Sequence, residues 1–104
     1  MDPKFPGKDA ASQVHTRVFG VGVTEPLHFH RFRAEVWIIL KGEALIFSEG
    51  LEFQAEAGQS VTIPRFSRHG LVNKGDTPCE VLEVWIYPQA ASDELKEDYI
   101  LCEE

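Results

Sequence analysis

Turn signals are the feature of this sequence that most limits its fold. From Val14 to Pro88, short β-branched or apolar segments alternate with glycine, proline and polar turn residues. The signals recur about every 8 to 12 residues, a spacing typical of all-β sandwiches and barrels. One of them, Glu49-Gly50, is placed at the turn of a hairpin. The expected strands lie in VHTRVFGVGV, ALIFSEG, LEFQAEAG, SVTIP, HGLVN and CEVLEVWIYP.

The length of 104 residues suits a single domain. Residues 1–12 contain two prolines and little periodicity, so we expect an N-terminal arm there. Residues 13–88 form the expected β-barrel domain, and residues 89–104 form an acidic C-terminal tail. In that tail, Ser92 is placed to cap a short helix that includes Tyr99.

Composition excludes several kinds of partner. The net charge of −7 argues against binding a nucleic acid through bulk charge. The longest apolar stretch, VWIIL, has five residues, so no membrane span is expected. The segment MDPKFPGKDA is too polar for a secretory signal. Cys79 and Cys102 lack a metal or redox spacing, and we expect free thiols in a cytoplasmic protein whose partner is a small molecule.

Two segments, 35–41 and 81–87, are apolar on both faces apart from one glutamate each. Strands of this kind are covered on both sides. We expect one face to line a barrel interior and the other to meet a second sheet or another subunit. Because closed dimers are the commonest oligomers, the outer faces favour a homodimer. Their outward residues are Val36, Ile38, Leu40, Val84 and Ile86.

Histidines and a glutamate at the head of the first of these segments indicate a metal site. Side chains two apart in a strand point the same way, so His28 and His30 project together. Glu35 lies an odd number of residues further on, and a turn within RFRA is needed to bring it to the same place. His69 offers a third imidazole. This ligand set suits one divalent transition metal, namely Fe, Mn, Ni, Zn or Cu.

The spacing of these residues resembles two motifs of the cupin superfamily. The first motif matches Gly22-x5-His28-x-His30-x4-Glu35-x6-Gly42, and the second matches Gly58-x5-Pro64-x4-His69-x3-Asn73. The resemblance implies a single-domain jelly roll of two antiparallel sheets, in which His28, His30, Glu35 and His69 bind one metal, and it implies that dimers are common. A looser resemblance links AEVWIILKGEA and the C-terminal segment to the C-terminal cupin region of type II mannose-6-phosphate isomerases.

One residue departs from the cupin pattern. Cupins usually have glycine two residues after the proline of the second motif, where this chain has Phe66. If that glycine is left-handed in the family, Phe66 is strained or the loop has rearranged. Phe66 is also a candidate to cover the metal site and contact the substrate.

Further candidates surround the ligands. Glu83 stands alone in an apolar strand, and we interpret it either as a general base beside the metal or as a carboxylate satisfied at a subunit contact. Trp37 and Trp85 are candidate pocket walls, or ordinary core residues. Four arginines flank the ligands, namely Arg31, Arg33, Arg65 and Arg68. They could form a basic rim, in which Arg65 and Arg68 attract an anionic substrate, although exposed loop arginines are the simpler interpretation.

Three functions fit these observations. The first is isomerase or lyase chemistry, in which the metal polarises an oxygen of a sugar-like or acid-like substrate and Glu83 moves a proton. The second is a dioxygenase with a redox metal in an apolar pocket. The third is a small-ligand-binding or sensing module without turnover. The metal and the substrate are left open by the ligand types alone.

Overall fold

The computed structural model describes residues 11–87 and 99–102. Regular structure within these ranges is entirely β, which confirms the expected all-β fold. The strands are β1 (Ala11–Phe19), β2 (Thr24–Phe29), β3 (Ala34–Lys41), β4 (Glu43–Ser48), β5 (Leu51–Glu56), β6 (Ser60–Ile63), β7 (His69–Val72), β8 (Cys79–Tyr87) and β9 (Ile100–Leu101).

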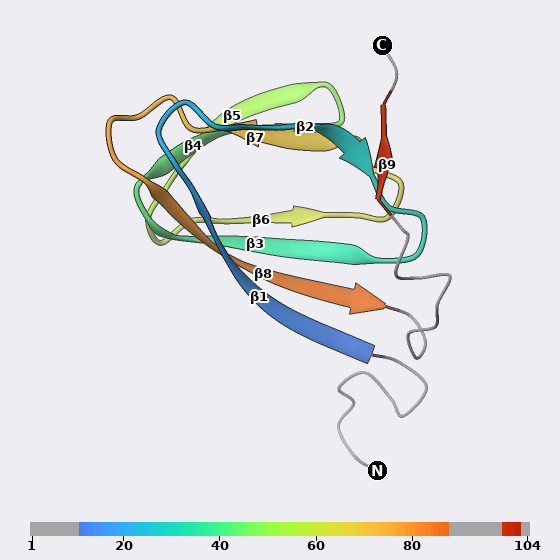
Figure 1. The fold of residues 1–104 in the computed structure, drawn as a ribbon. Helices are drawn as coiled ribbons and strands as arrows, with labels where there is room; N and C mark the ends of the chain where they lie inside the picture. Colours follow the sequence, from blue (N-terminus) through green and yellow to red (C-terminus); the bar gives the residue numbers. More distant parts are fainter. Residues whose placement is uncertain (1–10, 88–98, 103–104) are drawn as a thin grey trace.

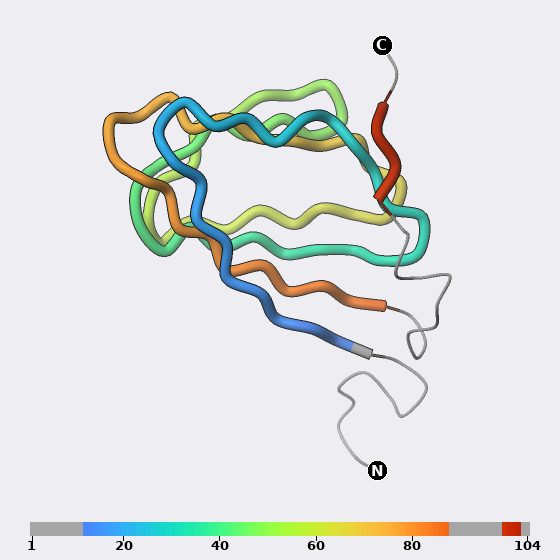
Figure 2. The backbone as a smooth tube through the Cα atoms, viewed as in Figure 1, coloured from blue at the N-terminus to red at the C-terminus, as the bar shows by residue number. Residues whose placement is uncertain are grey.

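The strands form two antiparallel sheets that face each other (Figure 1). One sheet has four strands in the order β1-β8-β3-β6, and the other has five in the order β5-β4-β7-β2-β9. Apart from the β4–β5 hairpin, each strand lies in the opposite sheet from the strand before it, as the backbone in Figure 2 shows. This is the alternation of a jelly roll. It brings side chains from distant parts of the sequence together between the sheets.

Turn chemistry explains two of the reversals. Ser48 pairs with Leu51, and the residues between them, Glu49 and Gly50, have φ values of 53° and 80°. Positive φ at both central positions matches the twist of the flanking strands, so the expected hairpin is confirmed. Gly42 has a φ of 78°, and a Cβ there would lie 2.5 Å from the carbonyl oxygen of Pro78. Only glycine fits that corner.

The interior changes character along the strands. On the inner face of β8, the buried Cys79 and Val81 are followed by the buried Glu83. On β1, the buried Phe19 is preceded on the same face by Arg17. An apolar core therefore fills one end of the barrel, and polar side chains gather toward the other. The buried core consists of Phe19, Trp37, Ile39, Ala44, Ile46, Ala55, Ile63, Leu71, Cys79 and Val81.

The outer face of the four-stranded sheet carries several exposed apolar side chains. Val14 and Val18 on β1 are both 64% exposed, whereas Arg17 between them points inward to contact Glu25 and Glu83. The usual arrangement of apolar side chains inside and polar side chains outside is thus reversed on this strand.

Three smaller expectations have mixed outcomes. Cys79 and Cys102 are free, as expected. No helix among the described residues is long and apolar enough to cross a membrane. The predicted helix cap at Ser92 lies outside the described residues, but Tyr99 directly precedes strand β9, so its assignment to a helix is wrong.

Candidate metal centre

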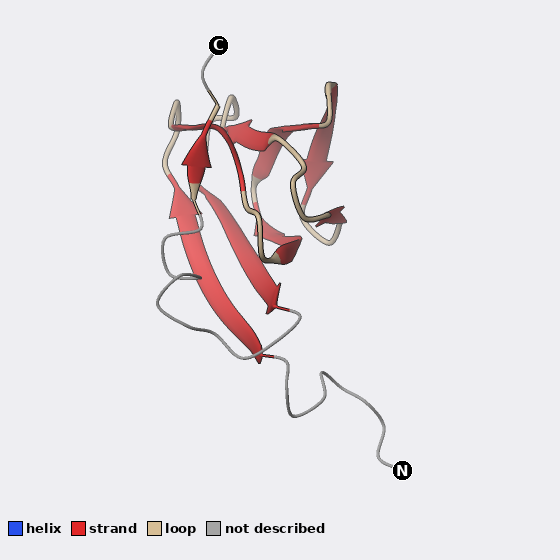
Figure 3. Cartoon of the chain, turned by 90° about the vertical axis from the view of Figure 1, so that its right-hand side faces the viewer, coloured by secondary structure: helices blue, strands red, loops and turns tan. Residues whose placement is uncertain are grey.

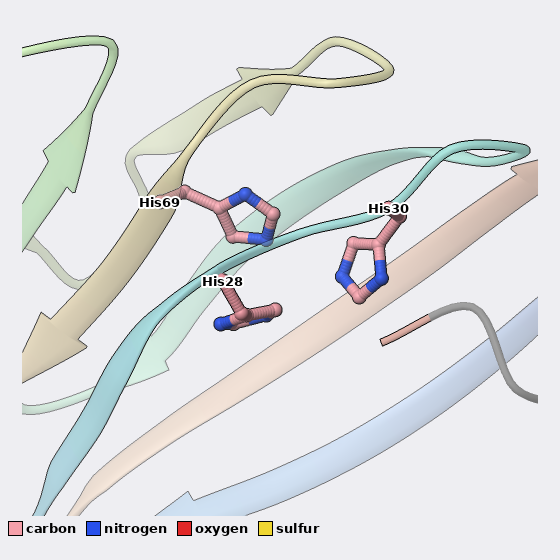
Figure 4. Close-up of side chains that lie close together, drawn as sticks. All are labelled: His28, His30 and His69. Atoms are coloured by element: carbon pink, nitrogen blue, oxygen red, sulfur yellow. The ribbon is translucent and has the colours of Figure 1, made fainter. Parts of the chain in front are cut away.

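Three imidazoles meet between the sheets. His28 lies near the end of β2, His30 follows that strand, and His69 begins β7 (Figure 4). One ring nitrogen from each lies within 4.8 Å of those of the other two. Their side chains are buried, with exposures of 3%, 2% and 0%. The predicted convergence of these three residues is therefore found, and together they could hold one metal ion.

Backbone carbonyls fix the orientation of two of these rings. His28 Nδ1 lies 2.8 Å from the carbonyl oxygen of Pro26, and His69 Nδ1 lies 2.7 Å from that of Ser67. A proton on Nδ1 in each ring leaves Nε2 with its lone pair, the state that a metal ligand needs. Nε2 of His69 is buried and has no hydrogen-bond partner.

Burial keeps the same histidine neutral. Loss of solvent lowers the pKa of His69 to about 4, although its hydrogen bond to Ser67 acts in the opposite direction. A buried, neutral imidazole with an unbonded nitrogen lone pair is suited to bind a divalent transition metal, so the chemistry of the histidine cluster fits such an ion.

Glu35 lies beside the cluster. The chain crosses from one sheet to the other between β2 and β3, and this crossing places Glu35 Oε2 3.0 Å from His30 Nε2. Two neighbouring ligands of an octahedral ion, each about 2.1 Å from the metal, are separated by about 3 Å. The group whose ligand atoms all lie within 4.8 Å of one another contains the three histidines and not Glu35, so its role as the fourth ligand stays a prediction.

A buried arginine holds this carboxylate. Arg33 Nε donates to Glu35 Oε2 over 2.7 Å, and Trp37 Nε1 donates to Oε1 over 2.7 Å. Burial by itself raises the pKa of Glu35, but the hydrogen bonds from His30 and Trp37 and the charge of Arg33 outweigh it and lower the pKa to about 2. The carboxylate is therefore ionised and fixed in one orientation.

Arg33 was not foreseen in this role. Its side chain is only 8% exposed, so the interpretation as an exposed loop arginine is wrong for this residue. The guanidinium lies 3.5 Å from the centre of the Trp85 ring and donates to Tyr87. The usable signal was its position two residues before Glu35, which puts both side chains on one side of an extended chain.

Glu83 is buried on the inner face of β8, with 1% of its surface exposed. Trp85 Nε1 donates to Oε1 over 2.9 Å. Oε2 has no hydrogen-bond partner, and Arg17 Nη1 lies 3.5 Å away. Burial raises the pKa of Glu83, more than the Trp85 hydrogen bond and Arg17 lower it. Glu83 therefore faces the barrel interior, which is the position that the general-base interpretation requires, and does not lie on the outer face of its sheet.

The two tryptophans belong to this polar network. Trp37 is 1% exposed, lies opposite Glu83 in the β3–β8 register, and packs its ring edge-on against His69 at 5.5 Å. Trp85 has the ring of His15 3.9 Å away in addition to the guanidinium of Arg33. Both indoles therefore donate to a buried carboxylate and contact an imidazole.

The loop before His69 carries the remaining candidates. Phe66 has a φ of 68°, so it occupies the left-handed region that its place in the motif suggested. Its ring is 58% exposed, and its amide donates to the carbonyl of His30 over 2.8 Å. Arg65 and Arg68 are exposed; Arg65 Nε donates to the carbonyl of Arg31, and the Arg68 side chain lines a surface groove of about 270 Å³ beside the β4–β5 hairpin.

Two further residues join the site without any local sequence signal. Glu25 on β2 forms a 2.7 Å ion pair with Arg17. Tyr99, which precedes β9, donates from its hydroxyl to Glu25 over 3.0 Å and stacks its ring on His28. Burial and the bond to Glu25 raise the pKa of Tyr99 to about 12.

Comparison with known proteins agrees with this architecture. A family model described as a cupin domain matches residues 15–87. The chain belongs to the cupin family. The fold of this cupin is similar to that of a predicted oxalate decarboxylase from Thermotoga maritima, known from a crystal structure. The two superpose with a TM-score of 0.69 and 27% identity, over 71% of this chain and 64% of the other. The jelly-roll expectation is confirmed.

Sequence relatives of this cupin are larger proteins. Mannose-1-phosphate guanylyltransferase from Klebsiella pneumoniae is 34% identical over 79 residues, which are 73% of this chain and 17% of that protein. Alginate biosynthesis protein AlgA from Pseudomonas aeruginosa is 38% identical over 63 residues, 61% of this chain and 13% of that protein. The chain spans less than a fifth of either relative, and the likeness concerns the cupin region alone.

Proposed function

We propose that this cupin is a metal-dependent isomerase or lyase that acts on a small sugar-like or acid-like molecule. His28, His30, His69 and Glu35 would hold one divalent cation of the Fe, Mn, Ni, Zn or Cu type. When bound, the cation supplies Lewis-acid polarisation of a substrate carbonyl or carboxylate oxygen. The oxalate decarboxylase likeness and the sugar-nucleotide relatives both support a small oxygen-bearing substrate.

The observation that carries the proposal is the state of Glu83. One of its oxygens accepts a hydrogen bond from Trp85, and the other is buried without a hydrogen-bond partner, 3.5 Å from the guanidinium of Arg17. A buried carboxylate with a raised pKa is a stronger base than an exposed one and holds a proton more readily once it has accepted it. Glu83 Oε2 would take the proton from the carbon next to the polarised carbonyl and return it to the neighbouring carbon.

Neighbouring residues define how Glu83 acts. Trp37 lies across the strand pair from Glu83, and its ring meets that of His69 edge-on with the ring centres 5.5 Å apart, so the indole contacts both the proposed base's strand and the histidine cluster. Arg17, 3.5 Å from Oε2, limits the rise in the pKa of Glu83 and can stabilise negative charge that develops on the substrate.

The same interior disfavours the dioxygenase alternative. The dioxygenase hypothesis requires an apolar pocket, for which the two tryptophans were the candidate walls. Instead, each indole donates to a buried carboxylate, and two arginines face inward beside them. A binding module without turnover remains the alternative that experiment must separate.

The experiment has three parts. Protein purified without a tag or added metal is analysed for bound metal. It is then incubated in D2O with a panel of ketoses, aldoses and 2-hydroxy acids. We expect zinc, manganese or nickel, and deuterium incorporation next to a carbonyl, reduced by about 100-fold or more in Glu83→Gln. The matched control is Glu80→Gln, the same substitution on the outer face of β8, three residues before Glu83.

Each contrary result has a separate meaning. Oxygen consumption with bound iron would replace the proposal with a dioxygenase. Binding of a panel member without exchange or conversion would leave a sensing module. Full exchange by Glu83→Gln would remove Glu83 as the base.

The exposed arginines and the outer sheet face add two proposals. Arg65 and Arg68 would attract an anionic substrate toward the end of the barrel at which His69 lies; their joint replacement by glutamine should then weaken binding of an anionic panel member and leave binding of a neutral one unchanged. The outer face of the four-stranded sheet, with its exposed apolar side chains, would pair with a second copy of the chain to form a homodimer.

A further inference from the structure

Strand β9 is held against the part of β2 that carries His28. Leu101 is paired with His28 and Ile100 with Phe29, and the amide of Cys102 donates to the carbonyl of Leu27 over 3.1 Å. In Figure 3, which views the barrel from the side on which β9 lies, this short strand is on the near side of the molecule. The chain therefore returns to the metal site after the barrel has been completed.

This contact lies where β2 is otherwise weakly held. On its other edge, β2 pairs with β7 at Glu25 and again at His28, but the register shifts between these positions. Pro26 lies in the irregular stretch and has no amide proton to give to a ladder. The backbone before His28 thus has fewer sheet hydrogen bonds on the β7 side, and β9 supplies bonds from the opposite side.

The side chain of Tyr99 adds two contacts of different kinds. Its ring stacks on the imidazole of His28, with ring centres 4.1 Å apart and planes inclined by 16°. Its hydroxyl donates to Glu25 Oε2 over 3.0 Å. The other oxygen of Glu25 lies 2.7 Å from Arg17 Nη1, the same atom that lies 3.5 Å from Glu83 Oε2. One side chain thus touches a candidate metal ligand and the network that reaches the proposed base.

We propose that Tyr99 is a positioning residue of the metal centre. Its ring holds His28 in the orientation that binds the cation, and its hydroxyl holds Glu25, and through it Arg17, beside Glu83. The first half concerns metal binding alone, whereas the second half rests on the proposed role of Glu83.

Cobalt(II) titration tests the ring. Affinity is measured by calorimetry, and the ligand geometry by the visible spectrum of bound cobalt. Tyr99→Leu removes the stacking, so it should weaken cobalt binding and change the visible spectrum. We expect the affinity to fall by about 10- to 100-fold, as it does when other groups that orient metal ligands are lost. Tyr99→Phe keeps the ring and should bind cobalt with nearly wild-type affinity.

A matched control separates positioning from general docking of β9. Leu101 is 56% exposed and belongs to the same strand, and Leu101→Ala should leave cobalt affinity and spectrum unchanged. If Tyr99→Leu binds cobalt as the wild type does, or if Leu101→Ala weakens it equally, the ring has no specific role. If the wild type itself binds no cobalt, zinc or manganese, the proposed function fails at its first step, a result distinguishable from a failure confined to Tyr99→Leu.

The hydroxyl is tested by the titration of Glu83, followed by NMR in protein with ¹³C-labelled glutamate side chains. Glu83→Gln identifies the resonance. In Tyr99→Phe the pKa of Glu83 should rise further, because Arg17 is no longer held beside it by Glu25. An unchanged titration in Tyr99→Phe would overturn this half of the proposal.

Discussion

Glu35 and Glu83 occupy equivalent positions in two copies of one four-residue sequence, EVWI. Each carboxylate accepts a hydrogen bond from the tryptophan two residues later. The strands are antiparallel neighbours, so Glu35 lies opposite Trp85, and Glu83 lies opposite Trp37. The same local structure is thereby presented twice on one inner face.

Their surroundings give the two carboxylates opposite properties. Bonding to His30 and Arg33 outweighs the burial of Glu35 and lowers its pKa to about 2. Burial dominates for Glu83 and raises its pKa. A pair of acidic groups whose pKa values are moved apart in this way is typical of a division of chemical roles.

We therefore predict that Glu35→Gln and Glu83→Gln have different defects. Glu35→Gln removes the anionic oxygen beside the histidines and should weaken zinc binding by at least about 10-fold. Glu83→Gln should bind zinc with wild-type affinity, since no metal-binding atom is changed. Zinc affinity is measured by calorimetry with a competing chelator. Equal affinities in the two variants would show that Glu35 is not a ligand.

The stability of the metal-free protein should depend on the protonation of His69. Its pKa is about 4 in the folded chain and 6.5 in the reference state, so between these values the unfolded chain binds more protons. The contribution is fully present above pH 6.5 and is lost as the pH falls toward 4. At about 1.4 kcal/mol per pKa unit, the loss approaches about 3 kcal/mol. Burial lowers the pKa of His28 in the same direction.

Urea unfolding at pH 7 and pH 4.5 measures this loss. His69→Asn is the matched variant, because an asparagine amide can replace the Nδ1 donor to Ser67 without titrating in this range. We expect a smaller decrease in unfolding free energy for His69→Asn than for the wild type. An equal decrease would mean that other groups cause the acid sensitivity.

Phe66 stores backbone strain that a glycine would relieve. A non-glycine residue in the left-handed region costs about 1–2 kcal/mol, partly offset by the greater chain entropy of unfolded glycine. Phe66→Ala removes the exposed ring and keeps the strain, whereas Phe66→Gly removes both. We predict that the glycine variant is more stable than the alanine variant by about 1 kcal/mol in urea unfolding. An alanine variant of equal or higher stability would contradict a strained Phe66.

Several parts of the fold follow from local rules that the sequence displays. Alternation explains why His28 and His30 point to one side, and positive-φ turn chemistry explains the reversal at Glu49-Gly50. The spacing of His69 relative to both histidines came from the cupin resemblance, because nothing in a single strand specifies which distant strand will face it.

Other parts depend on tertiary context. Each face of β1 mixes polar and apolar residues, so the sequence does not show which face is buried. The face with His15 and Arg17 points inward, where Glu25 and Glu83 form ion pairs with the arginine. A rule that buries apolar residues assigns that face to solvent. Tyr99 and Glu25 are 74 residues apart, so their hydrogen bond has no local signature.

The reversed face of β1 leads to a prediction about assembly. Val14 is 64% exposed and lies opposite Val84, which in turn lies opposite Val36 on β3. The outer-face residues on the two sides of this row are all uncharged: Thr16, Leu82 and Ile38 on one side, and Ser12, Ile86 and Ala34 on the other. Two copies that each carry a net charge of −7 repel one another least when such a neutral surface forms the contact.

We predict that the wild type is a dimer through this face and that Val14→Glu is a monomer. The substitution places a carboxylate in the apolar row, where a partner would have to bury it unpaired. Val14→Thr, which keeps the β-branched shape, should remain a dimer. Light scattering after size exclusion gives the masses, and the melting temperature of the wild type, unlike that of Val14→Glu, should rise with protein concentration. A monomeric wild type, or a dimeric Val14→Glu, would exclude this face as the interface.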